Sequence, residues 1–481
     1  MKTIIVSIIF LSCSLASACS KSAQGSGTDP GNPNPDEKTS IAEQNLIRAI
    51  ELADKAVSAY FTGNSMKMAR YYNPYTGNQS QEVGSVWMYT SAIEAANSIL
   101  SALEEFKAKG KADLYNKHFQ NYNTLLESLH ENAAYYKGTF TLTSYTQTRE
   151  WTVYGVNRGR DKGTAAVDGI NNVYDDQQWL IRELIEAYKL TGKETYLREA
   201  EYLTEYVLDG WDYTLDANGK EHGGITWGPG YVTKHSCSNG PLISPLVWLS
   251  EIYRNKTDEI SHIFIDADKK RQVRSDKKSD YYLDFAKKVY EWQKGKLLRS
   301  DGVYDDMMGG CGNCQVGYET IDGVRYRKHV DLTNRVGPPY SYNSGSMLSG
   351  AADLYRVTND NLYLQDAKQL TNASFQKFAK LGATIPDHYT YDISGFNNWF
   401  NNVLLRAYID IYPFYADAGK AVESFQKNLD YGYNKFLYKG MLPTNLLIGW
   451  NRESGNNQTE GMFAFSFASE YARLALHELN K

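Results

Sequence analysis

The stretch 176–210, DQQWLIRELIEAYKLTGKETYLREAEYLTEYVLDG, contains two helical patterns of different character joined by a short turn. The second pattern, over 194–209, is apolar on one face only, and Gly210 supplies its stop. The residues on that face are Leu197, Ala200, Leu203 and Val207. The first pattern, over 176–191, is apolar more nearly all round, which predicts a helix buried on most sides. The stretch therefore predicts a hairpin of one buried inner helix and one outer helix.

The same joint recurs far downstream. Residues 187–200 and 354–367 align without gaps, each with Tyr in the second position, a Thr before Gly192 or Asn359, and a Tyr-Leu pair beyond the turn. Similar periodicity predicts helices over 41–61, 86–108, 112–136, 176–191, 194–209, 239–254, 279–296, 341–357, 361–380, 396–413, 416–430 and 459–478. Twelve helices in six hairpins predict an all-α protein with an (α/α)6 toroid. A right-handed solenoid is the alternative, but its repeats keep a more regular period.

Four irregular inserts interrupt the helical pattern. They are 138–172, 211–238, 255–278 and 301–340. Long inserts rich in Gly and aromatic residues favour loops that build a functional site, and we expect all four at one kind of joint. The basic run 269–278 is expected to be a solvated surface loop. No linker interrupts 40–481, which we interpret as a single catalytic domain.

The composition narrows the classes of partner. A formal net charge of -5 gives no support to a nucleic acid or an anionic lipid surface as a partner. The chain has 38 Tyr and 9 Trp residues, and such rings offer apolar faces with a polar edge. Sugars present matching C–H faces, so this richness suits a glycan site. Most single Tyr residues are nevertheless expected to be packing residues.

The N-terminus predicts export. Residues 1–18 have Lys2 as a positive start, an apolar run and Ala16-Ser17-Ala18 before Cys19, which resembles the lipobox of bacterial lipoproteins. We expect lipidation of Cys19 and an anchor in the outer membrane, facing either the cell surface or the periplasm. Plain secretion is the alternative. Residues 19–39 are rich in Ser, Gly, Pro and Asp and predict a flexible tether.

The cysteines beyond the tether predict no metal centre. In an oxidising compartment, Cys311 and Cys314 are expected to form a local disulfide or a weak metal half-site, and Cys237 to be free and buried. Zinc is not expected because no second Cys pair exists. The eight His residues lack metal-ligand spacing. We expect no cofactor.

Two adjacent carboxylates begin the helix of 176–191. Cleavage of a glycosidic bond needs one carboxyl to protonate the leaving oxygen and another to attack or to activate water. Asp175 and Asp176 could place their carboxyls about 5 Å apart, which favours a retaining mechanism over the ~6.5–9.5 Å inverting arrangement. Their proximity should also separate their pKa values. The alternative is structural, because Asp175 and Gln178 have the spacing of a capping box.

A second Val-Tyr-Asp-Asp tetrad occurs at 303–306. It lies in an insert among Gly302, Gly309 and Gly310, and no inner-helix pattern follows it. We interpret Asp305 and Asp306 as a loop or a cation-binding turn. This pair is the main competitor for the role of active site.

Spaced blocks of the chain resemble glycoside hydrolase family 76, the endo-α-1,6-mannanases. The blocks are Tyr174-Asp175-Asp176 with Trp179, Ala187-Tyr188 through Thr191-Gly192, Tyr196-Leu197, Gly210-Trp211-Asp212, Gly223 to Trp227, Lys234 to Gly240, Tyr342 to Gly345, Leu354-Tyr355 and Phe396 to Arg406. The resemblance covers most of 84–480. It implies an (α/α)6 fold and a retaining endo-α-1,6-mannanase acting on α-1,6-linked mannan, such as that of fungal cell walls. It also implies Asp175 as nucleophile and Asp176 as general acid/base.

The resemblance has two departures, both of which bear on the outer subsites and the tolerated branching. Asn397-Asn398 stands where Lys-Gly is expected, and the insert 311–335 has no counterpart.

Further residues are candidates for substrate contact. Trp211 and Trp227 could stack on sugars, while Tyr342 and Asn343 could bind mannose hydroxyls. Lys234, His235 and Asn239 precede an inner helix on the expected cleft side. The substrate-binding candidates are Tyr174, Trp211, Trp227, Lys234, His235, Asn239, Tyr342 and Asn343. Each of these residues could instead be structural.

Two other functions remain as hypotheses. One is a non-catalytic glycan-binding lipoprotein of an outer-membrane uptake system, which needs no paired carboxylates. The other is a different toroid enzyme, an unsaturated uronide hydrolase or a polysaccharide lyase, which handles acidic sugars. For the mannanase we expect a monomer that contacts the membrane only through its lipid.

Overall fold

Twelve α-helices form two concentric layers in the computed structural model, counted over residues 40–451 and 457–481, which the structure describes. The inner helices are α2 (Val86–Ala108), α4 (Tyr174–Thr191), α6 (Ile243–Tyr253), α8 (Ser341–Thr358), α10 (Asn397–Ile411) and α12 (Gly461–Asn480). The outer helices are α1 (Ile41–Tyr60), α3 (Asp113–Ala133), α5 (Glu194–Asp209), α7 (Lys278–Leu297), α9 (Asn361–Phe378) and α11 (Gly419–Phe436). The predicted signal peptide, Cys19 and the tether lie outside the described residues.

The inner layer is a closed ring. Helix α2 packs against α4, α4 against α6, α6 against α8, α8 against α10, α10 against α12, and α12 returns to α2. Each inner helix also packs mainly against one outer helix: α2 with α3, α4 with α5, α6 with α7, α8 with α9, α10 with α11 and α12 with α1. Closure rules out the solenoid. The predicted (α/α)6 toroid is confirmed.

The burial of the two layers follows the sequence pattern. Helix α4 is buried on most sides, including polar Gln177, Arg182 and Glu183, as its nearly continuous apolar pattern predicts. Helix α5 buries mainly the stripe that contains Leu197, Ala200 and Leu203. Inner helices therefore carry polar side chains into the centre of the ring.

The repeated joint has one physical explanation in both copies. Gly192 ends α4 with φ +67°, and Asn359 ends α8 with φ +55°, so both chains turn through the left-handed region that Gly and Asn tolerate best. The preceding Thr191 and Thr358 hydroxyls each donate to the carbonyl four residues back, at 2.7 Å. The gapless alignment thus reflects two identical helix ends.

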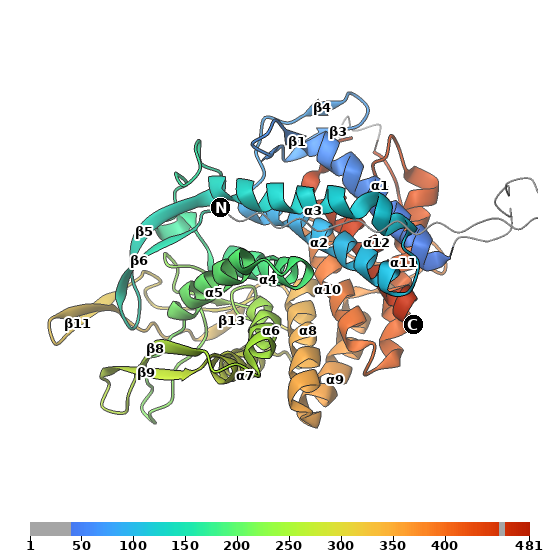
Figure 1. The fold of residues 1–481 in the computed structure, drawn as a ribbon. Coiled ribbons are helices and arrows are strands. Elements are labelled where there is room, and N and C mark those ends of the chain that lie inside the picture. Colours follow the sequence, from blue (N-terminus) through green and yellow to red (C-terminus); the bar gives the residue numbers. More distant parts are fainter. Residues whose placement is uncertain (1–39, 452–456) are drawn as a thin grey trace, which may run out of the picture. The chain divides into compact units, whose positions relative to one another are not determined.

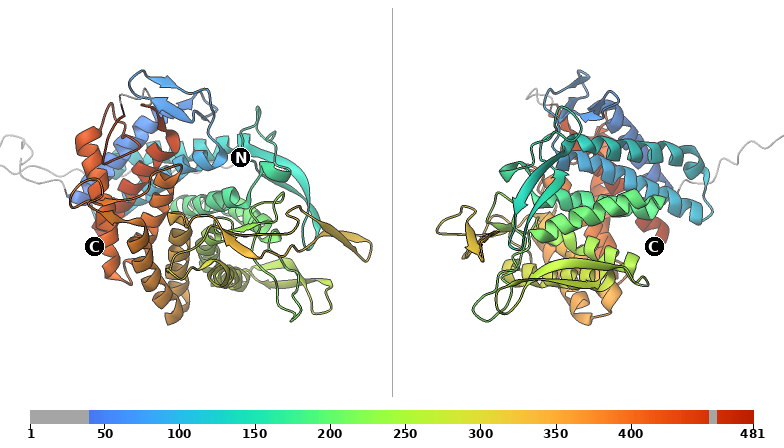
Figure 2. Two further views of the ribbon diagram at one scale, coloured as in Figure 1. Left: turned by 180° about the vertical axis from the view of Figure 1, so that it is seen from behind. Right: turned by 60° about the vertical axis from the view of Figure 1, so that its left-hand side comes forward.

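The inserts contain strands that the helical analysis did not predict. The hairpins are β5 (Lys137–Thr143) with β6 (Thr148–Tyr154), β8 (Glu259–Ile265) with β9 (Arg271–Lys277), and β11 (Tyr318–Ile321) with β12 (Val324–Arg327). A three-stranded sheet joins β7 (Lys234–His235), β10 (Met307–Gly309) and β13 (Asn334–Val336). Short strands complete the list: β1 (Phe61–Thr62), β2 (Lys67–Met68), β3 (Tyr71–Asn73), β4 (Asn78–Gln79), β14 (Lys380–Leu381), β15 (Tyr389–Thr390) and β16 (Thr459–Glu460). Figures 1 and 2 show the larger hairpins grouped on one side of the helices.

Two expectations about the inserts are wrong. The basic run 269–278 is solvated as expected, but it is largely strand β9 of a hairpin and not a loop, because its almost entirely polar residues suit a solvated strand. Insert 255–278 follows an inner helix, α6, whereas the other three inserts follow the outer helices α3, α5 and α7. Only those three begin at the end of the ring where the inner helices start.

No helix among residues 40–451 and 457–481 combines the length and apolarity that a bilayer crossing requires.

Candidate active site

A cavity of about 450 Å³ opens where the inner helices begin. Four of those helices contribute side chains from their first turns: Trp87 from α2, Asp175 and Asp176 from α4, Tyr342 from α8, and Trp399 from α10. The inserts 138–172, 211–238 and 301–340 complete the wall, and insert 255–278 contributes nothing to it. Antiparallel packing of each helical hairpin thus brings the starts of inner helices and the three inserts together.

The two adjacent aspartates face this cavity, and neither is the N-cap residue of the helix. The residue that precedes α4, Val173, makes no side-chain capping bond. Gln178, the partner that a capping box requires, instead donates to the Ser238 carbonyl at 2.6 Å. The backbone amide of Tyr174 donates to the Trp227 carbonyl at 2.7 Å and fixes the helix start to insert 211–238. The capping-box alternative is therefore wrong.

Burial separates the pKa values of the two carboxyls. Desolvation raises the pKa of Asp175 to about 6, while the Cys237 thiol and the first backbone amides of the helix act in the opposite direction. Desolvation and the charge of Asp175 together raise the pKa of Asp176 well above its usual value. Near neutral pH Asp175 is therefore the ionised member and Asp176 the protonated one.

Asp306 from the second Val-Tyr-Asp-Asp tetrad lines the same cavity. Burial and the charge of Asp175 raise its pKa to about 6, and the nearby Asn343 amide partly offsets this rise without being in hydrogen-bond geometry. The two tetrads that looked like competitors in the sequence thus contribute to one site.

Asp305 has a different role from its neighbour. Its carboxylate lies 2.8 Å from Arg299 Nη1 and 3.7 Å from Arg335 Nε, so its charge is already neutralised by two cations. Among the described residues no group of three or more His, Cys, Asp or Glu side chains could hold a metal ion. The pair 305–306 therefore offers one carboxylate to the cavity and one to an ion-pair cluster.

Aromatic rings form the walls around the carboxyls. Trp87, Trp399 and Phe400 contact one another edge to face or in stacked geometry, and Tyr342 stacks on Phe400 with ring centroids 4.2 Å apart. A second group comes from insert 211–238, where Trp227 stacks on His235 at 4.8 Å. Burial lowers the pKa of His235 to about 4, so this ring is neutral at physiological pH.

Several polar atoms of these walls have no hydrogen-bond partner within the described part of the chain. They are the indole nitrogens of Trp87, Trp227 and Trp399 and one carboxylate oxygen of Asp175. The Trp227 indole nitrogen influences the Asp175 carboxylate electrostatically but lies outside hydrogen-bond geometry. Buried donors and acceptors are normally paired, so this cavity has spare hydrogen-bonding capacity for a polar ligand.

The other predicted substrate contacts divide into two groups. Trp227, His235 and Tyr342 line the cavity, and Asn343 lies behind it against Asp306. The remaining four residues, Tyr174, Trp211, Lys234 and Asn239, are buried outside the lining.

Each of the four has a structural partner. The Tyr174 ring packs against Tyr206 and Gly210, and the Trp211 indole donates to Glu221 at 2.9 Å. We therefore revise the role of Tyr174, Lys234 and Asn239 from contacting sugar to supporting the wall, whereas Trp211 lines a separate hollow outside this cavity.

The wall behind the cavity has its own polar framework. Lys234 donates to Asp212 at 2.8 Å and to the Gly223 carbonyl at 2.6 Å, and its charge helps to keep the pKa of Asp212 well below the usual value. Asn239 exchanges hydrogen bonds with the backbone of Ile225 at 2.8 and 2.9 Å. These bonds fix insert 211–238, which carries Trp227 and His235.

Sequence reasoning missed Trp87, Trp399, Phe400 and Tyr340 as lining residues. Position at the start of an inner helix is the signal that could have found Trp87 and Trp399. Asp306 was singled out as a rival, not as part of the site, because the tetrads are far apart in sequence.

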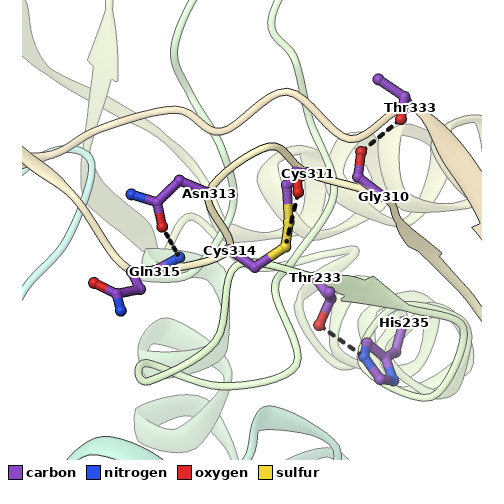
Figure 3. The surroundings of a disulfide bond; sticks show 8 residues. All are labelled: Thr233, His235, Gly310, Cys311, Asn313, Cys314, Gln315 and Thr333. Carbon is purple, nitrogen blue, oxygen red and sulfur yellow. Dashed lines mark hydrogen bonds between the residues drawn. A yellow bond between two sulfur atoms is a disulfide. The ribbon is translucent and has the colours of Figure 1, made fainter.

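The cysteines are arranged as two unrelated features. Cys311 and Cys314 form a disulfide in the insert before α8, drawn in Figure 3 beside the Thr233–His235 hydrogen bond. Cys237 is free, buried and part of the cavity wall, where it interacts with Asp175 and Tyr342.

Comparison with curated proteins identifies yeast relatives. Mannan endo-1,6-alpha-mannosidase DCW1 of Saccharomyces cerevisiae is 27% identical over 179 residues, which cover 37% of this chain and 31% of that protein. The corresponding protein of Candida glabrata is 24% identical over 177 residues, covering 36% and 31%. The chain thus spans about a third of the length of the curated relatives that it matches.

Solved structures share the fold over nearly the whole chain. The glycoside hydrolase family 76 mannosidase Bt3792 from Bacteroides thetaiotaomicron VPI-5482 has a TM-score of 0.64 at 19% identity, covering 90% of this chain and 98% of that one. The GH76A alpha-1,6-mannanase from Salegentibacter sp. HEL1_6 has a TM-score of 0.56 at 19% identity, covering 90% and 99%. An inactive variant of that mannanase, with two neighbouring aspartates replaced by asparagine, is in complex with alpha-1,6-mannotriose; it has a TM-score of 0.56 at 18% identity, covering 90% and 99%.

One family description accounts for most of the sequence. The sequence model of Glycosyl hydrolase family 76 matches residues 68–259 and 273–464. These segments include both Val-Tyr-Asp-Asp tetrads and the starts of all six inner helices. The chain therefore belongs to glycosyl hydrolase family 76.

Proposed function

We propose that this protein is a retaining endo-α-1,6-mannanase that cuts α-1,6-linked mannan backbones. The observation that carries the proposal is the pair Asp175–Asp176, which lies at the start of a buried helix in an aromatic cavity. The names of the mannan-hydrolysing relatives supply the substrate class.

The two raised pKa values support a division of roles. Asp175, the more readily ionised, attacks the anomeric carbon and forms a mannosyl ester as the glycosidic C–O bond breaks. Asp176, protonated in the free enzyme, gives its proton to the leaving oxygen. In the second step Asp176 takes a proton from water, whose oxygen displaces Asp175 from the anomeric carbon and restores both carboxyls.

The adjacency of the two aspartates argues for retention. Carboxyls of retaining glycosidases lie about 5–5.5 Å apart, whereas inverting enzymes need roughly 6.5–9.5 Å to admit a water molecule. Consecutive residues on one helical turn suit the shorter separation. The outcome is an α-configured product from an α-linked substrate.

The cavity walls suit a neutral sugar. The rings of Trp87, Trp227 and Trp399 offer apolar faces together with spare indole N–H donors. Asp306 offers a carboxylate that can accept from sugar hydroxyls. No Lys or Arg side chain lies among the lining residues that the structure describes, which argues against the acidic substrates of uronide hydrolases and lyases.

The cellular setting is also a proposal. The lipobox-like sequence before Cys19 supports an exported, monomeric lipoprotein that is anchored to the outer membrane through this residue. Labelling with a radioactive fatty acid tests this. Label retained by a Cys19→Ala variant would contradict the proposal.

The decisive activity test uses purified protein with linear α-1,6-mannan and with a polyuronide. We expect short manno-oligosaccharides from the first and no product from the second. The single variants Asp175→Asn and Asp176→Asn should each lose cleavage while still binding mannan. Mannan binding without cleavage by the wild type would instead favour a glycan-binding lipoprotein.

A further inference from the structure

A second hollow, of about 730 Å³, lies at the same end of the ring as the catalytic cavity. It is formed between the last turns of α7 and the first half of insert 211–238, and we call it the Trp292 hollow. We propose that the Trp292 hollow is an accessory binding site for a segment of neutral glycan chain. The identity of that chain as α-1,6-mannan rests on the proposed function.

The size and the position of the hollow suit a ligand. Its volume falls within the range of about 300–1,000 Å³ that is common for small-molecule sites. None of its lining residues lines the catalytic cavity. It is therefore a separate site, not an extension of the first one.

The indole of Trp292 packs directly against the backbone of Gly223 and Gly224. Gly223 and Gly224 both have positive φ, at +69° and +76°, and a Cβ on Gly224 would lie 2.3 Å from the Trp292 ring. Only glycine lets the chain approach this ring so closely. Trp292 itself remains half-buried and lines the hollow, so the support covers part of the ring and leaves part available to a sugar face.

The polar groups around Trp292 favour a neutral polyhydroxylated ligand. Glu221 is fixed by the Trp211 indole at 2.9 Å and by Lys288 at 3.1 Å. Glu291 and Lys296 are exposed and both line the hollow. Donors and acceptors of both signs lie side by side, and hydroxyl groups satisfy both kinds. A purely anionic or cationic ligand would meet like charge in this hollow.

The hollow and the cavity share one wall. Lys234 of β7 binds the carbonyl of Gly223, which lines the hollow, whereas the next residue, His235, lines the catalytic cavity. A polymer held at Trp292 would raise the effective concentration of its own neighbouring units at the cavity. The benefit should therefore appear with long chains and not with short ones.

Affinity electrophoresis tests the site without requiring turnover. The full-length protein with Asp175→Asn and Asp176→Asn would be run in gels containing α-1,6-mannan, with and without Trp292→Ala. We expect Trp292→Ala to weaken retardation by roughly tenfold in apparent Kd. The variant Trp292→Phe keeps an aromatic face and should retain most of the binding. Trp450→Ala removes another half-buried Trp, which lines neither hollow nor cavity, and should bind as the parent does.

A second variant distinguishes the loss of a binding contact from misfolding of the protein. Glu291→Ala with Lys296→Ala removes exposed groups only, and should weaken retardation while leaving the melting temperature unchanged. If both this variant and a folded Trp292→Ala protein bind mannan as tightly as the parent, the accessory site is disproved. Failure of the proposed function is a different result, since wild-type protein would then release no oligosaccharide from mannan.

Discussion

Replacing Cys237 by Ala should shift the acid limb of the pH–activity profile upward. The Cys237 thiol interacts with the Asp175 carboxylate and lowers the Asp175 pKa, which burial has raised to about 6. A full hydrogen bond to a charged acceptor contributes about 1.5–3 kcal/mol, and a nearby thiol contributes less, so the loss of the thiol should raise the pKa by about one unit. Because the nucleophile acts as the carboxylate, activity requires pH above that pKa.

The size of the effect depends on pH. At pH 6 the ionised fraction of Asp175 should fall from about one half to about one tenth, a roughly fivefold loss in kcat/KM. At pH 8 the two proteins should differ by only about a tenth. Initial rates on a manno-oligosaccharide between pH 4 and pH 9 measure both values.

A matched control separates electrostatics from packing. Cys237→Ser keeps a donor of similar size and should leave the acid limb at or below its wild-type position. The reasoning is refuted if Cys237→Ala loses the same factor at pH 6 and pH 8, or if its acid limb does not move.

Three further predictions concern stability and roles. Burial raises the pKa of Asp209 to about 6, so the folded state binds this proton more tightly than the unfolded state does. The stabilisation that the proton provides is full below about pH 4 and is lost as pH rises through about 6. Between pH 4 and pH 8 the wild-type protein should therefore lose about 3 kcal/mol of unfolding free energy that Asp209→Asn does not lose, as urea titrations at the two pH values measure. Arg406→Met should lower the free energy of unfolding by about 2 kcal/mol, since buried Glu94 loses the cation 3.2 Å away and keeps only Arg473, at 3.5 Å. An unchanged urea midpoint would contradict this. With azide and an activated α-mannoside, Asp175→Ala should yield the β-mannosyl azide and Asp176→Ala the α-mannosyl azide. NMR distinguishes the two products, and the reverse pairing would mean that the nucleophile and the acid/base are the other way round.

The helices could be predicted from sequence because their periodicity is local. The prediction of 194–209 matches α5. The similar sequences around Gly192 and Asn359 predicted similar turns, and the structure has two matching helix ends there. The strands in the inserts could not be predicted in this way. Hairpins such as β8–β9 depend on cross-strand pairing, which a search for period 3.6 does not detect.

The cavity itself could be anticipated only in part. Asp175 and His235 were found because they adjoin the start of an inner helix or lie shortly before one, and Trp227 was found as a ring that could stack on a sugar. Asp306 reaches the same cavity through strand pairing between β10 and β7, a contact between distant segments. Lys234 shows the opposite error, since its neighbour faces the cavity while its own ammonium binds Asp212 behind the wall.

The most direct test of two neighbouring aspartates acting by double displacement is the anomeric form of the first product. Proton NMR spectra would be recorded within minutes of adding wild-type protein to α-1,6-manno-oligosaccharide, before mutarotation equilibrates the new reducing end. The account predicts that the α-anomer appears first and the β-anomer grows in later. Initial formation of the β-anomer would contradict it, because a single inverting displacement would then be at work.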